Sequence, residues 1–147
     1  MKIAIGSDHA GWKLKAALVQ LLKNKGFAVL DVGCENSTRR VDYPDYAQSV
    51  AQAVAGKKAR YGVLCCGTGI GMSIAANKIP GIRASVAWNE KSASLAQEHN
   101  AANILCLGGR LLSKSKAAAC LWAFLNSTPS SAPRHRQRIE KIRQLEK

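Results

Sequence analysis

The chain has 147 residues, 47% of them hydrophobic, a size and composition that suit one globular domain with a core of its own. Its apolar stretches are too short for a membrane-spanning helix and its N-terminus does not resemble a signal peptide, so we expect a cytoplasmic protein without a membrane partner. The 22 lysines and arginines outnumber the 9 acidic residues, and the net charge of +13 favours an anionic ligand.

Nucleic acid is one such ligand, but the chain has no zinc finger, RNP-type aromatic motif or other recognisable reading module. We therefore rank a basic nucleic-acid-binding module well below a protein that binds phosphorylated metabolites, and expect no nucleic-acid partner. Part of the charge is concentrated in the last fourteen residues, where a solvated helix face is its simplest meaning.

The cysteine pattern excludes a disulfide framework and a zinc site, because the count is odd and no Cys-x-x-Cys pair occurs. No metal ligand set is recognisable from the His and Cys spacing either. The five cysteines are Cys34, Cys65, Cys66, Cys106 and Cys120.

Apolar periodicity and Gly/Pro punctuation predict alternating strands and helices along the chain. In chain order these are strand 2–6, helix 12–25, strand 27–32, helix 44–54, strand 61–66, helix 72–77, strand 83–88, helix 90–98, strand 103–107, helix 113–125 and helix 133–147.

Five short apolar strands separated by helices predict an α/β fold: a three-layer α/β/α arrangement around a five-stranded, parallel, doubly wound sheet. We find no domain boundary, and interpret residues 1–147 as a single domain. Residues 127–147 comprise a Ser- and Pro-rich linker and a basic C-terminal helix, which is expected to pack on a partner subunit.

Reactive side chains follow three of these strands, and ligands of open α/β sheets bind at the carboxyl ends of the strands. Asp8 and His9 follow the first strand, Cys66 and its glycine loop end the third, and Arg110 follows the fifth. An acid, an imidazole, a thiol and a guanidinium are therefore predicted to meet at one rim. Singly, Asp8 could be a helix N-cap and His9 a structural surface residue.

The loop Gly67-Thr68-Gly69-Ile70-Gly71 has the residues that let backbone N–H groups face an anion at a helix start. A dinucleotide fingerprint is the obvious alternative, but the loop follows the third strand and lacks the required glycine spacing. A simple tight turn is about as consistent with the loop alone. The neighbouring reactive groups favour the anion site.

Cys66 is the candidate reactive thiol, because N–H donors at a helix start lower the pKa of a thiol. Strand alternation points Cys65 to the opposite face of the sheet. We interpret the other cysteines as small buried apolar residues.

His99, Arg134 and Arg138 are candidates of a different kind. The helix after the fourth strand runs back toward the amino ends of the strands, so His99 should lie away from its own rim. Its simplest role is a helix C-terminal residue favoured by the dipole, and if it is catalytic it serves another subunit. Arg134 and Arg138 share one helix face and suit a phosphate, with solvated charge as the alternative.

The sequence resembles the ribose-5-phosphate isomerase B family, whose relatives isomerise allose 6-phosphate and galactose 6-phosphate. The resemblance covers nearly the whole chain. The matching pieces, in family order, are GSDHAG (6–11), DYPDYA (42–47), CGTGIGMSIAANK (66–78), GIRA (81–84), EHNAAN (98–103) and RHRQR (134–138).

The resemblance implies a reversible, cofactor-free and metal-independent isomerisation of ribose 5-phosphate and ribulose 5-phosphate. It also implies a homodimer, or a dimer of dimers, with active sites shared between subunits. Isomerisation of a six-carbon sugar phosphate is the closest alternative. Some members use a glutamate base within the glycine loop, but here that position is Met72 and Cys66 is present, so the chain is similar to the cysteine-base branch.

The resemblance also implies a role for each candidate residue. Cys66 is the base, Thr68 and the loop N–H groups of Gly67, Gly69 and Gly71 stabilise the enediolate, and Asp8 and His99 assist ring opening. The remaining residues bind the substrate: Asn100 and Tyr43 contact the sugar, and the phosphate-binding residues are His9, Arg110, Arg134 and Arg138.

Overall fold

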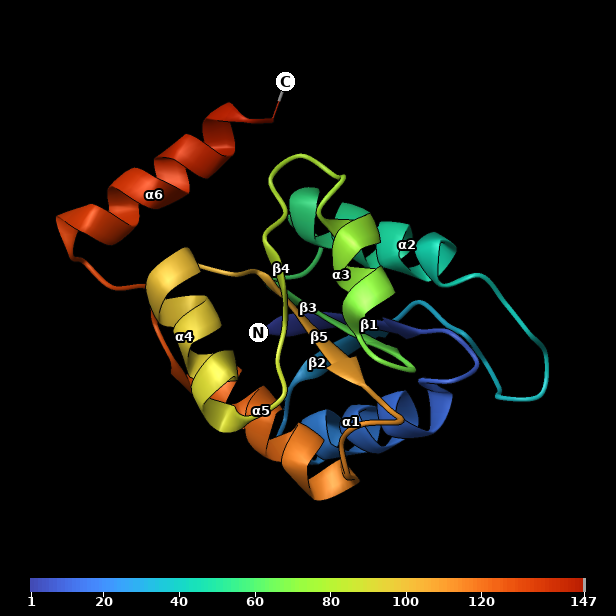
Figure 1. The fold of residues 1–147 in the computed structure, drawn as a ribbon. Helices are drawn as coiled ribbons and strands as arrows, with labels where there is room; N and C mark the ends of the chain where they lie inside the picture. Colours follow the sequence, from blue (N-terminus) through green and yellow to red (C-terminus); the bar gives the residue numbers. More distant parts are fainter. Residues whose placement is uncertain (147) are drawn as a thin grey trace.

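The computed structural model describes residues 1–146 and contains one sheet of five parallel strands between two layers of helices (Figure 1). The strand order is β2-β1-β3-β5-β4, which confirms the predicted three-layer, doubly wound α/β fold. The elements are β1 (Lys2–Ser7), α1 (Trp12–Asn24), β2 (Ala28–Asp31), α2 (Tyr43–Ala55), β3 (Tyr61–Cys66), α3 (Ile70–Ala76), β4 (Ala84–Val86), α4 (Glu90–Asn100), β5 (Ile104–Gly108), α5 (Lys114–Asn126) and α6 (Pro133–Gln144).

The element boundaries differ from the sequence prediction by a few residues at most, and three elements illustrate this. Helix α3 begins at Ile70, inside the predicted loop, because Gly69 has a φ of +81° and turns the chain directly into the helix. Strand β4 is shorter than predicted because the N–H groups of Arg83 and Trp88 donate to the side chains of Asn103 and Ser92 instead of to a strand. Helix α6 ends at Gln144 rather than 147, and residue 147 lies outside the described part of the chain.

Side-chain alternation along the strands builds a separate apolar core on each face of the sheet. Helices α1, α4 and α5 cover one face, where Cys65 lies among the core residues. Helices α2 and α3 cover the other face and bury Cys66 at the edge of their core. The opposite orientations predicted for Cys65 and Cys66 are therefore confirmed.

The turn between β1 and α1 approaches the end of β3 very closely. The N–H of Asp8 donates to the carbonyl of Cys65 at 3.3 Å, and a Cβ at Gly11 would lie 2.1 Å from that same oxygen. Asp8 is not the N-cap of α1, because Gly11 occupies that position; the Asp8 carboxylate instead accepts from the Gly11 N–H at 2.9 Å. Only glycine allows this contact, which fixes the Asp8 turn against β3.

A buried lysine holds the segment after β2 in place. Lys15, on α1, donates to the carboxylate of Asp31 at 2.6 Å and to the carbonyl of Cys34 at 2.8 Å. A buried ammonium is tolerated only with such partners. The two bonds therefore tie the start of the 32–42 loop to α1, beside the carboxyl end of β1.

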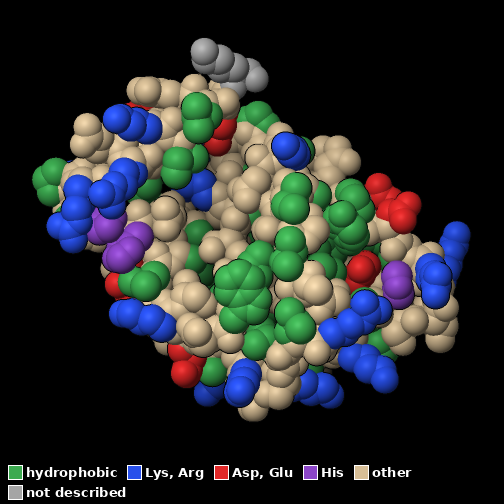
Figure 2. Space-filling model, viewed as in Figure 1, with side chains coloured by type: hydrophobic (Ala, Val, Ile, Leu, Met, Phe, Trp, Pro, Cys, Tyr) green, Lys and Arg blue, Asp and Glu red, His purple; other side chains and the backbone are tan. Residues whose placement is uncertain are grey.

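Helix α3, the segment after β4 and helix α6 carry exposed apolar side chains; Figure 2 shows hydrophobic surface over the middle of the molecule and further hydrophobic side chains toward α6. We call this surface the apolar face; its members are Ile70, Ile74, Trp88, Ile142 and Leu145. None of the helices within residues 1–146 has both the length and the apolar composition that a membrane crossing requires.

The close approach at Gly11 predicts a large loss of stability in Gly11→Ala. The added methyl overlaps a backbone oxygen that cannot retreat, so we expect the free energy of unfolding to fall by about 3 kcal/mol. Gly81→Ala is the matched control: its φ is +81° but nothing lies within 4 Å of an added Cβ, so we expect a loss of only about 1 kcal/mol. Urea unfolding measures both. Equal losses in the two variants would contradict the packing described here.

Candidate active site

The candidate site lies between β1 and β3, where the chain leaves the two strands toward opposite faces of the sheet. Helix α1 leaves β1 on one face and α3 leaves β3 on the other, so a crevice opens between the carboxyl ends of β1 and β3. Ligands of doubly wound folds bind at such a point. The chain brings together here the β1–α1 turn, the glycine loop after β3 and the Gly109-Arg110 turn after β5, as the sequence predicts.

Cys66 is the last residue of β3, and its sulfur accepts the Gly69 N–H at a distance of 3.0 Å between N and Sγ. The positive φ of Gly69 aims that N–H back at the strand end. Its packing also requires glycine, because an added Cβ would lie 3.1 Å from the backbone of Leu107. The Gly69 N–H therefore holds the sulfur at the end of the strand, against the glycine loop.

The exposed fraction of the residue distinguishes Cys66 from three of the other four cysteines. Cys66 is 5% exposed, whereas Cys65, Cys106 and Cys120 are fully buried. Burial also raises the pKa of each of these three thiols, so they remain protonated and unreactive. Cys34 is also 5% exposed, but its thiol donates to the Asn36 carbonyl at 3.2 Å.

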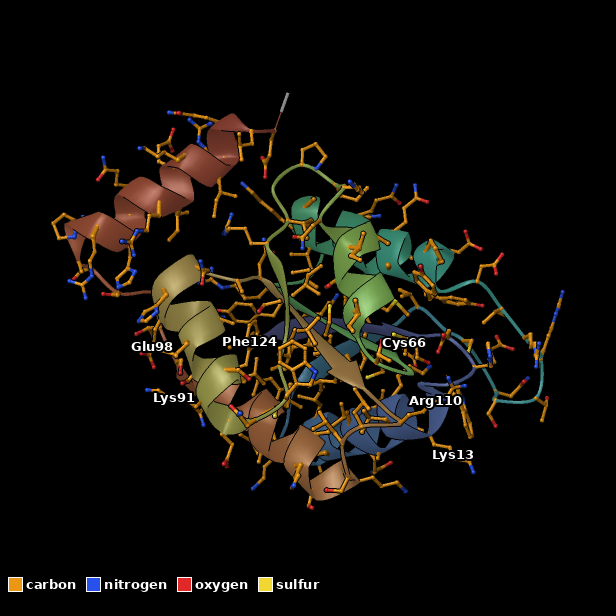
Figure 3. All side chains as sticks on the ribbon, in the orientation of Figure 1. Lys13, Cys66, Lys91, Glu98, Arg110 and Phe124 are labelled. Carbon is orange, nitrogen blue, oxygen red and sulfur yellow. The ribbon has the colours of Figure 1, made fainter. Side chains whose placement is uncertain are left out.

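Two glycines of the loop leave space for larger side chains. The guanidinium of Arg110 lies against Gly67, where an added Cβ would be 3.0 Å from Nη1. The ring of Tyr43 lies against Gly71, where an added Cβ would be 2.6 Å from the ring. Arg110 and Tyr43 therefore flank the loop, and Cys66 and Arg110 appear on the same side of the molecule in Figure 3.

The turn between β1 and α1 places an acid, Asp8, and an imidazole, His9, beside strand β3, which ends in Cys66. Asp8 is 7% exposed, and one carboxylate oxygen accepts the Gly11 N–H while the other is not hydrogen-bonded within residues 1–146. The Nδ1 of His9 accepts the Val41 N–H at 3.3 Å. That bond puts the proton of the neutral ring on Nε2, which becomes a donor.

Thr68 lies at the exposed tip of the glycine loop. Its hydroxyl oxygen accepts the Ile70 N–H at 3.2 Å, and its own proton is left to donate outward. The hydroxyl and the first N–H groups of α3 together offer donors beside the Cys66 sulfur.

The remaining predicted site residues lie elsewhere in the same chain. His99 and Asn100 end α4, which runs back to the amino ends of the strands as predicted, and Arg134 and Arg138 lie on α6. Glu98, the residue before His99, appears across the molecule from Cys66 in Figure 3. A single chain therefore does not bring these four residues to the thiol.

A stacked pair of histidines joins α4 to α6. The rings of His99 and His135 are parallel within 12° with centroids 4.3 Å apart. Burial lowers the pKa of His135, and the neighbouring His99, Arg134 and Arg138 lower it further. A neutral His135 can stack on His99 without charge repulsion, so the pair holds the first turn of α6 on the end of α4 near neutral pH.

Sequence reasoning missed two contributions to this site. The sequence pattern predicts no strand or helix between residues 32 and 44, but Val41 bonds to His9 and thereby brings Tyr43 to the rim. It also did not single out Ile70 and Ile74, which lie four residues apart on α3 and share its exposed side. That spacing was the sequence signal that could have identified them.

Within residues 1–146 no three His, Cys, Asp or Glu side chains are grouped closely enough to hold a metal ion.

Comparison with known proteins places this arrangement in a family. The model of the ribose/galactose isomerase family matches residues 3–142. Ribose-5-phosphate isomerase B of Escherichia coli is 45% identical over 145 residues, covering 99% of this chain and 96% of that protein.

Solved structures agree in fold as well as in sequence. Ribose-5-phosphate isomerase B of Clostridium thermocellum superposes with a TM-score of 0.96 at 44% identity, over 99% of this chain and 97% of the other. The ribose 5-phosphate isomerase of Thermotoga maritima gives a TM-score of 0.93 at 48% identity, over 97% of each chain. The chain therefore belongs to the ribose/galactose isomerase family of enzymes.

Proposed function

We propose that this enzyme interconverts ribose 5-phosphate and ribulose 5-phosphate through an enediolate, with Cys66 as the base. The observation that carries the proposal is the Cys66 sulfur, held at the rim by the Gly69 N–H in a chain whose relatives are named for this reaction. A five-carbon substrate is favoured over a six-carbon one because these relatives are named for ribose 5-phosphate.

The chemistry moves one proton between adjacent carbons. In the open-chain aldose the thiolate removes the proton from C2, and the C–H electron pair forms the C1–C2 double bond while negative charge collects on O1. The thiol then returns the proton to C1, and the O2 hydroxyl proton moves to O1 as the C2 carbonyl forms. A base whose pKa lies near the working pH performs both transfers best.

The enediolate oxygens need donors that are already in position. The Gly69 N–H already donates to the sulfur, so Thr68 and the backbone N–H groups of Gly67 and Gly71, in the same loop, supply them. One such preorganised donor typically contributes about 3 kcal/mol to transition-state stability.

The phosphate end of the substrate fixes the sugar relative to the sulfur. Arg110, against Gly67, and His9, with Nε2 as a donor, are its ligands from this chain, and Tyr43 covers the sugar. Binding energy from the unreactive phosphate then positions C1 and C2.

The other ligands are supplied by a second copy of the chain, so we propose a homodimer, on its own or within a dimer of dimers. His99 and Asn100 of one copy would reach the rim of the other, where His99 and Asp8 assist opening of the furanose ring and Asn100 holds the sugar. Arg134 and Arg138 would complete the phosphate site, because they are one helical turn apart and both exposed.

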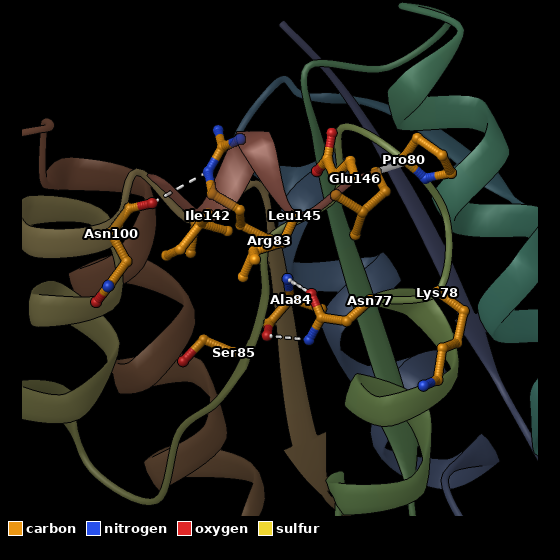
Figure 4. Close-up of a pocket in the computed structure, with 12 residues that line it drawn as sticks. Asn77, Lys78, Pro80, Arg83, Ala84, Ser85, Asn100, Ile142, Leu145 and Glu146 are labelled. Atoms are coloured by element: carbon orange, nitrogen blue, oxygen red, sulfur yellow. Dashed lines mark hydrogen bonds between the residues drawn. The ribbon is translucent and has the colours of Figure 1, made fainter. Parts of the chain in front are cut away.

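The apolar face supports this assembly. Ile70, Ile74 and Trp88 are 48, 58 and 53% exposed, which is unusual for side chains so large and apolar. Beside them a cavity of about 560 Å³ separates α6 from the α3–β4 loop and β4, with Ile142 and Leu145 on its wall (Figure 4). A second copy seated here would cover the apolar face and approach the glycine loop.

The proposed steps use no cofactor.

All five cysteines are free thiols, as expected in a reducing compartment, which supports a cytoplasmic location.

Cys66→Ala should abolish isomerisation and still bind substrate, because the substitution removes the base and leaves the phosphate ligands. We expect kcat to fall by about 10³-fold or more, measured by the appearance of ribulose 5-phosphate. Cys34→Ala is the matched control, since Cys34 has the same exposed fraction and should be dispensable for turnover. Near-normal turnover by Cys66→Ala would exclude the thiol base.

His99→Asn should slow the reaction of ring-closed ribose 5-phosphate and spare that of open-chain substrate, because His99 acts in ring opening. Equal loss on both substrate forms would argue against ring opening.

Mixing Cys66→Ala chains with His99→Asn chains tests whether sites are shared, since one of the two hybrid sites then has both residues intact. We expect activity to return on subunit exchange. Mixtures that regain no activity on ring-closed ribose 5-phosphate would argue against sharing.

A further inference from the structure

A second cavity lies at the amino ends of the strands, opposite the candidate active site. Its volume is about 660 Å³. Five of the chain's 22 lysines and arginines line it and no acidic residue does; they are Lys2, Lys57, Lys58, Arg60 and Arg83. We call it the basic cavity. The isomerisation described above uses none of these five side chains.

The cations of the basic cavity have no carboxylate partners. The two ion pairs within residues 1–146 are Lys15–Asp31 and Glu140–Arg143, and both lie elsewhere. Arg83 already donates to the carbonyl of Ala101 at the end of α4, so the other four cations carry the argument. Cations gathered without counter-charges repel one another, and a bound anion would relieve that repulsion.

One backbone bond and one side-chain contact hold Arg60 at the cavity. The Arg60 N–H donates to the Lys2 carbonyl at 2.9 Å, which fixes the segment after α2 against β1. The guanidinium of Arg60 lies 5.4 Å from the centre of the Tyr61 ring, a cation–π distance that limits its freedom. Arg60 is therefore positioned before any ligand arrives.

An unpartnered amide on the cavity wall is a second, independent sign of a ligand. Gln97 is 1% exposed and lines the basic cavity, and its Nε2 is without a hydrogen-bond partner in the described residues. A buried donor left unpaired costs free energy, and nearly all such groups in folded proteins have partners. Nε2 is enclosed by protein atoms, so an acceptor oxygen bound in the cavity would supply the missing partner once the amide turns toward it.

We propose that the basic cavity is a second anion site, which binds a small metabolite bearing two or more phosphate groups. Four cations suit several negative charges, and the volume falls within the range of about 300–1,000 Å³ common for small-molecule sites. A nucleic acid would instead require basic residues continued along a surface track. The walls of this partly open cavity, which include Gln97 and Pro129, favour a compact ligand.

Calorimetric titration with inorganic pyrophosphate tests the site in the full-length enzyme. We expect binding to the unaltered protein, and about tenfold or more weaker binding to Lys58→Gln/Arg60→Gln. Lys2→Gln, a single exposed change, should weaken binding in the same direction. Both variants should retain isomerase activity, since neither touches the rim that carries Cys66.

Two controls separate this site from general charge and from the active site. Lys23→Gln/Lys25→Gln removes equal charge from exposed positions outside the cavity and should bind pyrophosphate like the unaltered protein. Arg110→Gln weakens the proposed catalytic phosphate site and should also leave this binding intact. No binding to the unaltered protein, equal weakening by both double variants, or loss only in Arg110→Gln would overturn the proposal. Binding of a single-stranded oligothymidylate that is tighter than binding of pyrophosphate, and that both double variants weaken equally, would overturn it too.

Discussion

The hydrogen bond from the Gly69 N–H to the Cys66 sulfur is the contact on which the proposed chemistry depends. It exists because β3 ends in Cys66 and Gly69 can take a positive φ while packed on the backbone of β5. Gly67 and Gly71, in the same loop, have no side chains, and this allows Arg110 and Tyr43 to lie against the loop. One short glycine-rich segment thus orients the proposed base, its oxyanion donors and two substrate ligands.

The fold places chemistry at both ends of one sheet. The thiol, Asp8 and His9 lie at the carboxyl ends of the strands, whereas His99 and the α6 arginines are held near the amino ends by the His99–His135 stack. On the proposed assignment, a single chain therefore holds two halves of a site that face different directions. The apolar face offers the simplest means of joining them, because a second copy seated there would bring complementary halves together.

Much of this arrangement could be predicted from local sequence patterns. Alternating apolar runs predicted every strand and helix, and period-two alternation placed Cys65 and Cys66 on opposite faces. The strand order, the short β4 and the docking of Val41 on His9 could not be predicted, because each depends on partners distant in sequence, such as Asn103 for Arg83. The basic cavity was also missed, since its lysines and arginines come from β1, the α2–β3 loop and the start of β4.

Alkylation of the native enzyme by iodoacetamide, with each modified cysteine identified by mass spectrometry, tests the central claim most directly. The account predicts that Cys66 reacts first, that activity declines in step with its modification, and that saturating ribose 5-phosphate protects it. An enzyme that keeps full activity after complete modification of Cys66, or that loses activity while Cys66 stays unmodified, would contradict the account.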